Sequence, residues 1–240
     1  MVALFRIVEP SSGSIEIDGV NLLDLGLSRA RQATTIIPQD PVLFRGTVAH
    51  NLDPFSSASS ERHKEVITRA RLPSSLLDVQ VDKGGTNLSA GERQLLCFAR
   101  ALLHPRRVLV LDEATSNLDR ASDDAIQALL RSEFATTTLL TIAHRLGTVV
   151  DYHTILVMGG GRLLEHGAPS KLLETPGGTL ATLAGALGAT ELAALKQRAH
   201  ESAQAREGGY VAPSLTTMEV LAAEEGGGAP TGPPKADFWL

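Results

Sequence analysis

The spacing of apolar residues predicts alternating strands and helices along most of this 240-residue chain. Apolar or β-branched runs at 34–37, 108–111 and 138–142 are typical of strands, and the last two suit strands buried on both faces. Between them, helical spacing after Gly91 and over 120–131 predicts two helices. This alternation favours an α/β fold with a parallel sheet.

Weaker signals cover the first hundred residues. Residues 1–7 begin without an N-cap and are typical of the inside of a helix. Alternation over 14–19 predicts a strand, and residues 27–32 predict a short helix. From 48 to about 103 we expect mostly helix and loop, with no convincing strand.

The C-terminal third changes in composition. Strand-like segments at 154–158 and 162–165 flank three glycines, which predicts a β-hairpin. Residues 169–174 and roughly 180–205 have helical patterns. Residues 208–240 are rich in Gly, Pro, Ala and Glu, so we expect a disordered tail.

Composition narrows the classes of function. The formal net charge is −5, which argues against a nucleic-acid binder, because such proteins usually have a basic face. The sequence has no run of 18 or more apolar residues, so it predicts no membrane-spanning helix. The N-terminus lacks the features of a signal peptide. The single cysteine, Cys97, lies in an apolar helical run and is interpreted as core filler.

An acidic pair follows the second buried run. Asp112 and Glu113 come directly after 108–111, at the carboxyl end of the expected strand, where open α/β sheets bind ligands. Two adjacent carboxylates repel unless a cation or a hydrogen-bond donor is present, and Mg²⁺ held by one carboxylate and phosphates meets that need. The second carboxylate can take a proton from water. The alternative is that both acids only cap the next helix.

A second motif precedes the helix after Gly91. Ser89 and Glu92 have the spacing of a capping box. A serine and a glycine at a helix N-terminus also form an anion site, since free amides and the helix dipole face the anion. The two interpretations are compatible.

Five motifs in this order resemble those of the ATP-binding-cassette family, and the resemblance covers residues 1 to about 175. They match the Q-loop, signature, Walker B, D-loop and H-loop, at Gln39, Ser89–Gly91, Asp112–Glu113, Ser116–Asp119 and His144. Residues 5–10, 14–19, 41–48 and 51–54 further resemble the second nucleotide-binding domain of the C subfamily, the multidrug-resistance-associated transporters.

The resemblance implies a P-loop NTPase-type (RecA-like) parallel sheet with a helical signature subdomain over about 48–104. The expected organisation is a partial nucleotide-binding domain at 1–175, a helical extension at 176–207 and a disordered tail at 208–240.

The resemblance also implies a role for each matching residue. Gln39 would contact Mg²⁺ or the attacking water, Asp112 would bind Mg²⁺, and Glu113 would be the general base. Ser89 and Gly91 would hold the γ-phosphate of ATP bound to a second nucleotide-binding domain. Asp119 would bridge the two domains, and His144 would contact the γ-phosphate. The implied cofactors are ATP and Mg²⁺. The implied partners are that second domain and transmembrane domains, at the cytoplasmic face of a membrane.

The sequence departs from the family in two places that affect activity. It contains no G-x-x-x-x-G-K-[ST] loop, and none of its five lysines follows a glycine. It therefore resembles a cassette that starts just after its P-loop, incomplete at the N-terminal side of the sheet. We expect the isolated chain neither to bind ATP tightly nor to hydrolyse it. The second departure is Glu92, which stands where the family usually has glutamine.

Three functions remain open at this point. The first is the ATPase motor of an exporter, and the second is an inactive fragment that offers only Ser89 and Gly91 to a partner. The third is a soluble cassette ATPase without a transport role. The C-subfamily segments and the mild negative charge argue against the third. The sequence identifies neither the transported substrate nor the membrane.

Overall fold

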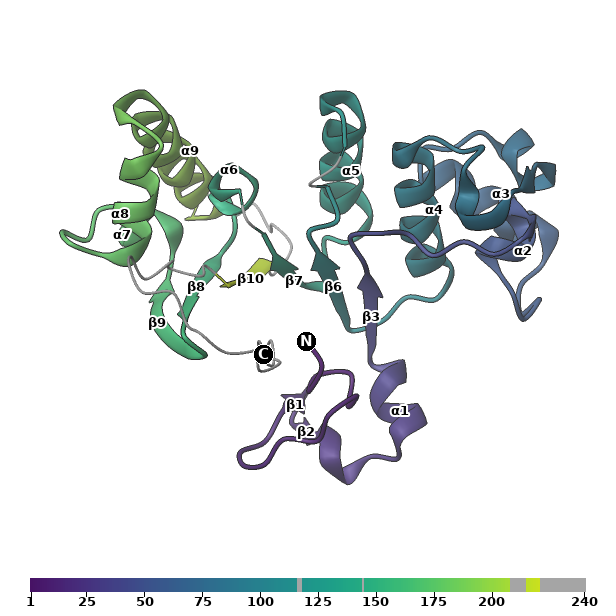
Figure 1. Ribbon diagram of the computed structural model, residues 1–240, viewed down its shortest axis with the longest axis horizontal. Coiled ribbons are helices and arrows are strands. Elements are labelled where there is room, and N and C mark those ends of the chain that lie inside the picture. Colours follow the sequence, from purple (N-terminus) through teal and green to yellow (C-terminus); the bar gives the residue numbers. More distant parts are fainter. Residues whose placement is uncertain (116–117, 144, 208–214, 221–240) are drawn as a thin grey trace, which may run out of the picture. The chain divides into compact units, whose positions relative to one another are not determined.

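A computed structural model describes residues 1–115, 118–143, 145–207 and 215–220 of the chain (Figure 1). Its contacts divide the chain into two compact units, one over Thr35–Ile142 with Ala205–Leu215, and one over Met1–Thr34, Ala143–Gln204 and Thr216–Leu240. The expected organisation into 1–175, 176–207 and 208–240 stays a prediction.

The first unit holds three strands of the sheet. They are β3 (Thr34–Ile37), β6 (Val108–Asp112) and β7 (Thr138–Ile142), in the order β3-β6-β7. β6 and β7 are parallel, with Val110 opposite Leu140. The continuous apolar runs account for this placement, because Leu109, Val110 and Leu139 are all at most 2% exposed. The α/β fold with a parallel sheet is therefore confirmed.

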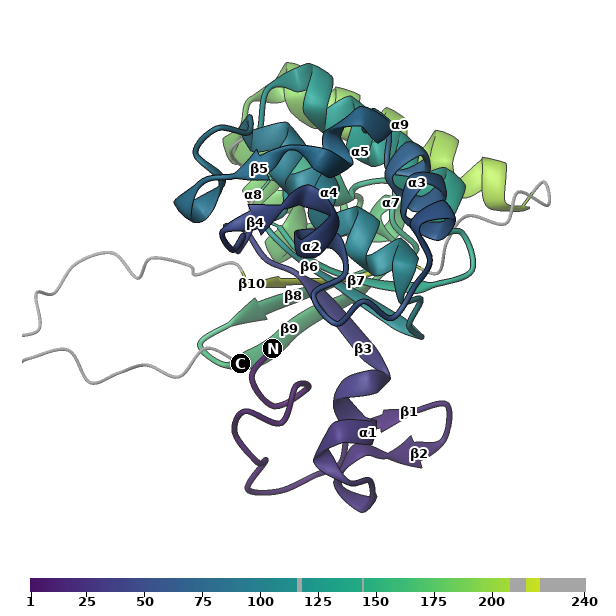
Figure 2. The same cartoon turned by 90° about the vertical axis from the view of Figure 1, so that its right-hand side faces the viewer.

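Helical segments form most of the region over 48–104, and one further helix follows β6. They are α2 (Val48–Leu52), α3 (Ser60–Arg69), α4 (Ala90–Leu103) and α5 (Arg120–Glu133), with two short 3-10 turns, η2 (Ser74–Asp78) and η3 (Lys83–Gly85). α4 contacts α2, α3 and α5, and Figure 2 shows α2, α3 and α4 gathered together. One hydrophobic core runs from Ile37 to Leu139 and includes Phe98 and the buried Cys97.

The expectation that 48–103 contains no strand is wrong in one detail. β4 (Gly46–Thr47) pairs with β5 (Gln80–Val81) in a two-residue antiparallel ladder. Pairs this short leave no periodic pattern in the sequence, so alternation cannot reveal them.

In the second unit, the first 34 residues form a small antiparallel hairpin and a helix. β1 (Glu16–Ile17) pairs with β2 (Val20–Asn21), and η1 (Leu22–Asp24) and α1 (Leu27–Gln32) follow. The expectation that residues 1–7 lie inside a helix is wrong, because this segment forms turns and Arg6 has a left-handed φ of 49°.

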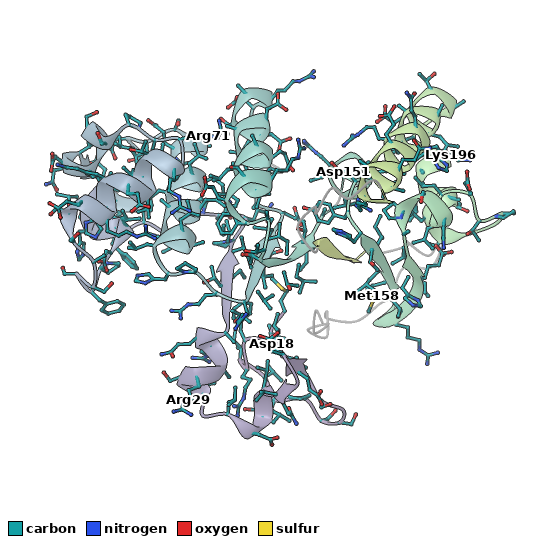
Figure 3. The ribbon with its side chains drawn as sticks, turned by 180° about the vertical axis from the view of Figure 1, so that it is seen from behind. Asp18, Arg29, Arg71, Asp151, Met158 and Lys196 are labelled. Atoms are coloured by element: carbon teal, nitrogen blue, oxygen red, sulfur yellow. The ribbon has the colours of Figure 1, made fainter. Side chains whose placement is uncertain are left out.

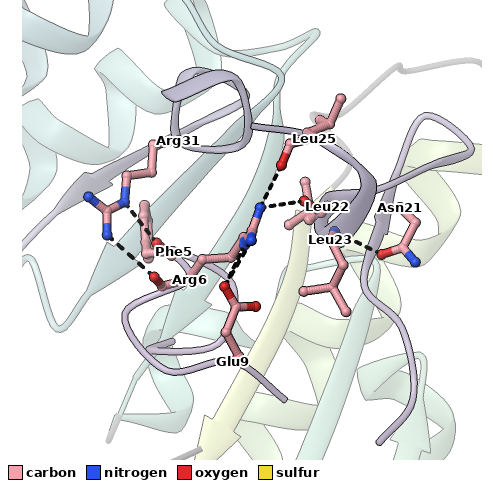
Figure 4. A network of polar contacts seen from close by, with 8 residues as sticks. All are labelled: Phe5, Arg6, Glu9, Asn21, Leu22, Leu23, Leu25 and Arg31. Atoms are coloured by element: carbon pink, nitrogen blue, oxygen red, sulfur yellow. Dashed lines mark hydrogen bonds and ion pairs between the residues drawn. The ribbon is translucent and has the colours of Figure 1, made fainter. Parts of the chain in front are cut away.

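An arginine network holds that turn instead (Figure 4). Arg6 Nη1 donates to the carbonyl oxygens of Leu22 at 3.0 Å and Leu25 at 2.7 Å, and its Nη2 pairs with Glu9 Oε1 at 2.8 Å. Arg31 Nη2 donates to the Arg6 carbonyl oxygen at 3.3 Å. Guanidinium donors thus bind main-chain carbonyl groups of the turn and of the segment around η1.

The remainder of the second unit begins with α6 (Leu146–Val149) and the predicted hairpin, β8 (Thr154–Gly159) and β9 (Arg162–Gly167). Gly160 and Gly161 both have positive φ, as a two-residue hairpin turn requires. β10 (Leu215–Val220), a strand that the sequence analysis did not predict, runs parallel to β8. The rest of 208–240 lies outside the described residues.

Three helices complete this unit, namely α7 (Pro169–Leu172), α8 (Thr179–Ala186) and α9 (Ala189–Glu207). The single helix expected over 180–205 is two helices, because Gly188 has a φ of 103° between them. Polar contacts hold α9 in place: Ser202 Oγ donates to the Asp151 carbonyl oxygen at 3.3 Å, and Arg198 lies 3.9 Å from the Asp151 carboxylate. Figure 3 labels Asp151.

Candidate functional site

The ends of β3 and β6 bring two of the expected site residues together. Gln39 lies two residues after β3 and Glu113 directly after β6. The Gln39 side-chain Nε2 donates to Glu113 Oε2 at 3.3 Å. The structure therefore brings the side chains of Gln39 and Glu113 into contact near the ends of two strands, and the roles of both residues stay predictions.

Glu113 has an unusual backbone conformation. Its φ is 46°, in the left-handed region where a side chain costs energy. Its amide donates to the Ile142 carbonyl oxygen at 3.0 Å, which ties the residue to the end of β7. Strained residues of this kind cluster at functional sites, where the surrounding structure holds a side chain in one direction.

Asp112 is the last residue of β6 and is partly buried. Among the described residues, no group of three or more His, Cys, Asp or Glu side chains is arranged to hold a metal by itself. Mg²⁺ is commonly held by one or two carboxylates together with phosphate oxygens. The Asp112 carboxylate and the Gln39 amide oxygen are hard oxygen ligands of the right kind.

Ser89 is the N-cap of α4, and it donates hydrogen bonds to Glu92, the residue that stands where the family usually has glutamine. Its amide and its hydroxyl each donate to Glu92 Oε2 at 2.8 Å, and the Glu92 amide donates back to Ser89 Oγ at 3.1 Å. The capping box is therefore complete. The Glu92 carboxylate occupies the position at the helix N-terminus where the dipole favours an anion.

Gly91 lies against the start of the next helix. A Cβ on Gly91 would collide with Ser122 Oγ and come within 3.1 Å of Ser122 Cβ, so only glycine allows α4 and α5 to approach this closely. Ser122 Oγ donates to Asp119 Oδ2 at 2.8 Å, and its amide donates to Asp119 Oδ1 at 3.0 Å.

These bonds also affect the charge of Asp119. The hydrogen bonds from the Ser122 amide and hydroxyl hold the pKa of the Asp119 carboxyl below its usual value. Ser89 and Asp119 are both exposed at the starts of their helices, and the two starts meet through Gly91 and Ser122. The first unit therefore presents two adjacent helix N-termini at its surface.

Comparisons with known proteins point to one family. A family profile described as ABC transporter matches residues 1–116. "ABC transporter C family member 8" of Dictyostelium discoideum is 49% identical over 178 residues, covering 72% of this chain and 11% of that protein. "ATP-binding cassette sub-family C member 3" of Homo sapiens is 48% identical over 182 residues, covering 73% of this chain and 12% of that protein.

The chain belongs to the ATP-binding-cassette family. Its nucleotide-binding domain is of the C-subfamily type. A solved bacterial Atm1-family ABC exporter with ATP bound matches this chain with a TM-score of 0.70 and 35% identity. The match covers 78% of this chain and 34% of the exporter chain. The P-loop NTPase-like fold is thereby confirmed. The chain spans 11% and 12% of the lengths of the two curated relatives named above.

Three expected parts of the cassette lie outside the described residues. They are His144 and two D-loop positions, Ser116 and Asn117. Within the described residues, no helix combines the length and apolar character that crossing a membrane requires.

The sequence analysis missed two residues of this site, Gln94 and Ser122. Gln94 is only 2% exposed, and its Nε2 donates to the Pro38 carbonyl oxygen at 3.2 Å. A signal for Gln94 existed, because it precedes the buried Phe98 and Ala101 by four and seven residues and so shares their face of α4. Ser122 follows Asp119 by three residues, the spacing of an N-cap and its partner.

Proposed function

We propose that this chain is the ATP-binding and ATP-hydrolysing motor portion of an ABC-type exporter. The observation that supports it most is the hydrogen bond between Gln39 and Glu113, beside Asp112 at the carboxyl end of β6. Gln39 is exposed, and Glu113 keeps its place beside Gln39 although its backbone is strained. A site that orients a water molecule explains both.

In this proposal each side chain has a separate task. Asp112 and the Gln39 amide oxygen hold Mg²⁺, which offsets the negative charge of the nucleotide phosphates when bound. Glu113 accepts a proton from the attacking water, and Gln39 keeps the Glu113 carboxylate oriented through its amide. His144 is assigned the contact with the γ-phosphate. General-base help of this kind is worth roughly 10²–10⁴-fold in rate.

Ser89, Gly91 and Asp119 serve a different nucleotide in this proposal. They lie at two adjacent helix starts, where amides and helix dipoles attract an anion. We assign Ser89 and Gly91 to the γ-phosphate of ATP held by a second nucleotide-binding domain, and Asp119 to the contact between the domains.

A P-loop is not present in this sequence, and that absence limits what the chain does alone. A lysine about 4 Å from a phosphate contributes roughly 4 kcal/mol at an effective dielectric near 20. Without it and the loop amides, the acidic pair repels ATP. The isolated chain therefore neither binds ATP tightly nor hydrolyses it, and it works with a nucleotide held by additional polypeptide.

Transmembrane domains are the proposed second partner, at the cytoplasmic face of a membrane. Apolar side chains near β4 and α2 support a docking surface in the first unit: Val42, Phe44 and Phe55 are 59%, 56% and 91% exposed. Exposed aromatic residues of this kind mark protein interfaces.

The capping box favours one alternative, a non-hydrolytic cassette that offers only Ser89 and Gly91 to its partner. Glu92 places a carboxylate at the proposed phosphate position and engages the Ser89 hydroxyl. The two functions differ in whether Glu113 matters, because only the hydrolytic motor needs a base at the end of β6.

The test fuses the chain behind a segment that carries an intact P-loop and measures ATP hydrolysis in the presence of a second nucleotide-binding domain. We expect Glu113→Gln to lower the rate by at least about 10²-fold. Asp124→Asn, on an exposed carboxylate of α5 that is 75% exposed, is the matched control and should leave the rate unchanged. Equal rates in the wild type and Glu113→Gln would contradict the motor and favour the non-hydrolytic alternative.

A second arm uses the chain as it stands. Isothermal titration calorimetry with Mg-ATP should give no binding at micromolar concentrations. A micromolar dissociation constant for the isolated chain would show that the missing P-loop has been replaced by other residues.

A further inference from the structure

A buried amide links α4 to the segment that carries Gln39. Gln94 lies in the second turn of α4 and is 2% exposed, and its Nε2 donates to the Pro38 carbonyl oxygen at 3.2 Å. Buried side-chain amides occur where a specific partner satisfies them, because an unpaired one is costly. The partner here is a single main-chain carbonyl group.

The Pro38 carbonyl group needs a side-chain donor because Pro38 lies where the chain leaves the sheet. It directly follows β3, and proline ends the hydrogen-bond ladder of a strand because it has no N–H. The chain after Pro38 leaves the sheet, so its backbone groups require partners from other elements. Gln94 supplies one from the adjacent helix.

The next residue along the chain is Gln39. Its Nε2 donates to Glu113 Oε2 at 3.3 Å. Two hydrogen bonds and one peptide bond therefore connect α4, the end of β3 and the end of β6. All three elements lie in the same compact unit.

We propose that Gln94 is a positioning residue that fixes the main chain at Pro38, so that Gln39 directs its amide at Glu113. The proposal rests on the proposed function insofar as Glu113 is the general base. Ser89 and Gly91 lie at the start of the same helix, so a displacement of α4 is transmitted to Glu113 through Pro38 and Gln39. Contact at the signature motif and orientation of the base are thereby coupled within one chain.

Gln94 fits this role better than other side chains of its size. Asparagine is one methylene shorter and does not span the same distance. Glutamate has no donor while ionised and brings a charge into the core. Methionine matches the length and fills the space without a donor, which makes Gln94→Met the substitution that removes only the hydrogen bond.

Other contacts hold the segment after Gln39, so losing one hydrogen bond does not release it. Arg100 Nη1 donates to the Val42 carbonyl oxygen at 2.9 Å, and Arg100 Nε donates to the Asn51 carbonyl oxygen at 2.7 Å. The Asn51 side-chain Nδ2 in turn donates to the Phe44 carbonyl oxygen at 2.8 Å. Gln94→Met therefore tests position rather than folding.

The experiment is solution NMR on the full chain labelled with ¹⁵N, without nucleotide. In Gln94→Met we expect the side-chain NH₂ signal of Gln39 to move toward that of a glutamine without the hydrogen bond to Glu113, and its hydrogen exchange to accelerate. Gln127→Met removes an amide from α5, where Gln127 donates only to Asp123 at 3.4 Å, and should leave the Gln39 signal unchanged. An unchanged Gln39 signal in folded Gln94→Met would overturn the proposal.

A double substitution separates positioning from a general loss of packing. Glu113→Ala by itself removes the acceptor of the hydrogen bond, so this single substitution already shifts the Gln39 signal. If Gln94 acts through the bond between Gln39 and Glu113, adding Gln94→Met to Glu113→Ala produces no further shift. Additive shifts would show that Gln94 affects Gln39 by another route and would overturn the proposal.

Should Gln94→Met not fold, Gln94→Asn replaces it. It retains an amide at the same depth, but that amide does not reach Pro38, so the Gln39 signal shifts if the link positions Gln39 and stays native if it does not. Because no nucleotide is present, these outcomes are independent of whether the chain belongs to an ATPase motor, which the Glu113→Gln rate measurement decides.

Discussion

Glu113 carries a backbone strain that is independent of what its carboxylate does. A left-handed φ costs a residue with a Cβ roughly 1–2 kcal/mol, whereas glycine adopts it freely. At most positions alanine is the more stabilising of the two small residues, because glycine loses more entropy on folding. At position 113 the order is expected to reverse.

The first prediction uses that reversal. Glu113→Gly and Glu113→Ala both lose the hydrogen bond from Gln39, so their difference reports the backbone alone. We expect the free energy of unfolding, measured with urea, to be about 1 kcal/mol higher for Glu113→Gly than for Glu113→Ala. A more stable alanine variant would show that the left-handed conformation carries no strain.

Asp53 presents a buried charge that three neighbours satisfy. It is 2% exposed and accepts hydrogen bonds from Ser57 Oγ at 3.0 Å, the Ala58 amide at 2.8 Å and His63 Nε2 at 3.1 Å. Burial acts to raise the pKa of Asp53, but the hydrogen bonds from Ser57, His63 and Ala58 outweigh it and hold that pKa well below its usual value.

The second prediction follows from this lowered pKa. A carboxyl with a depressed folded-state pKa stabilises the fold at pH values above its unfolded pKa of about 3.9, and that stability is lost as the pH falls below it. Asp53→Asn should lower the free energy of unfolding by about 2 kcal/mol at pH 7. It should also flatten the decline in stability below pH 4. Urea titrations at pH 7 and pH 3 test both parts, with exposed Asp124→Asn as the control.

At the scale of elements, α8 depends on a cap supplied by a distant strand. Its own N-cap is Gly178, which has no side chain to accept from the first amides of the helix. Glu165 in β9 accepts from the amides of Thr179 and Leu180 instead, the latter at 3.0 Å. This carboxylate also complements the positive end of the helix dipole.

The third prediction is local to that helix. Glu165→Ala should lower the free energy of opening of α8 by about 1 kcal/mol, since that is the usual cost of losing an N-cap. Hydrogen exchange followed by mass spectrometry on peptides covering 179–186 measures it. Glu191→Ala, at an exposed acidic position in the first turn of α9, should leave α8 unchanged, and an equal effect of both substitutions would contradict the cap.

Sequence patterns predicted elements wherever burial or turn chemistry left a strong signal. The buried apolar runs correctly predicted β6 and β7, and the β-branched run before Pro38 correctly predicted β3. The glycines after Thr154–Gly159 set the hairpin with β9. The patterns failed where structure depends on remote partners. The arginine contacts of Arg6 replace a helix at 1–7, and β10 forms by pairing with β8.

The candidate site was predictable to a similar extent. The buried run predicted that Asp112 and Glu113 lie at the carboxyl end of a strand, whereas Gln39 was identified only through the family resemblance. Gln94 and Ser122 were missed because each acts on a backbone or a neighbouring motif from a different element. One polar residue in an apolar helical face is a signal, yet spacing alone does not say which carbonyl group it reaches.

At the scale of the whole molecule, the hydrophobic core is unevenly distributed. The core cluster runs from Ile37 to Leu139 and lies entirely in the first unit. The second unit buries its own apolar side chains, among them Ile155, Val157 and Leu180. Units with separate cores can open separately.

The fourth prediction tests that independence. Leu180→Ala removes a side chain that is 1% exposed, a change that typically costs about 2–5 kcal/mol. We expect hydrogen exchange to accelerate in peptides from 143–204 and to remain at the wild-type rate in peptides containing Phe98 or Leu139. Uniform acceleration across both groups of peptides would mean that the chain unfolds as one cooperative body.

The bond between Ser89 and Glu92 has a consequence for how two such cassettes would come together. The serine hydroxyl already has an acceptor in its own helix, so an incoming phosphate would trade places with a carboxylate instead of filling vacant donors. Trading one acceptor for another changes the energy little. The hydrogen bond from Ser89 to Glu92 would therefore make closure around that phosphate easy to reverse.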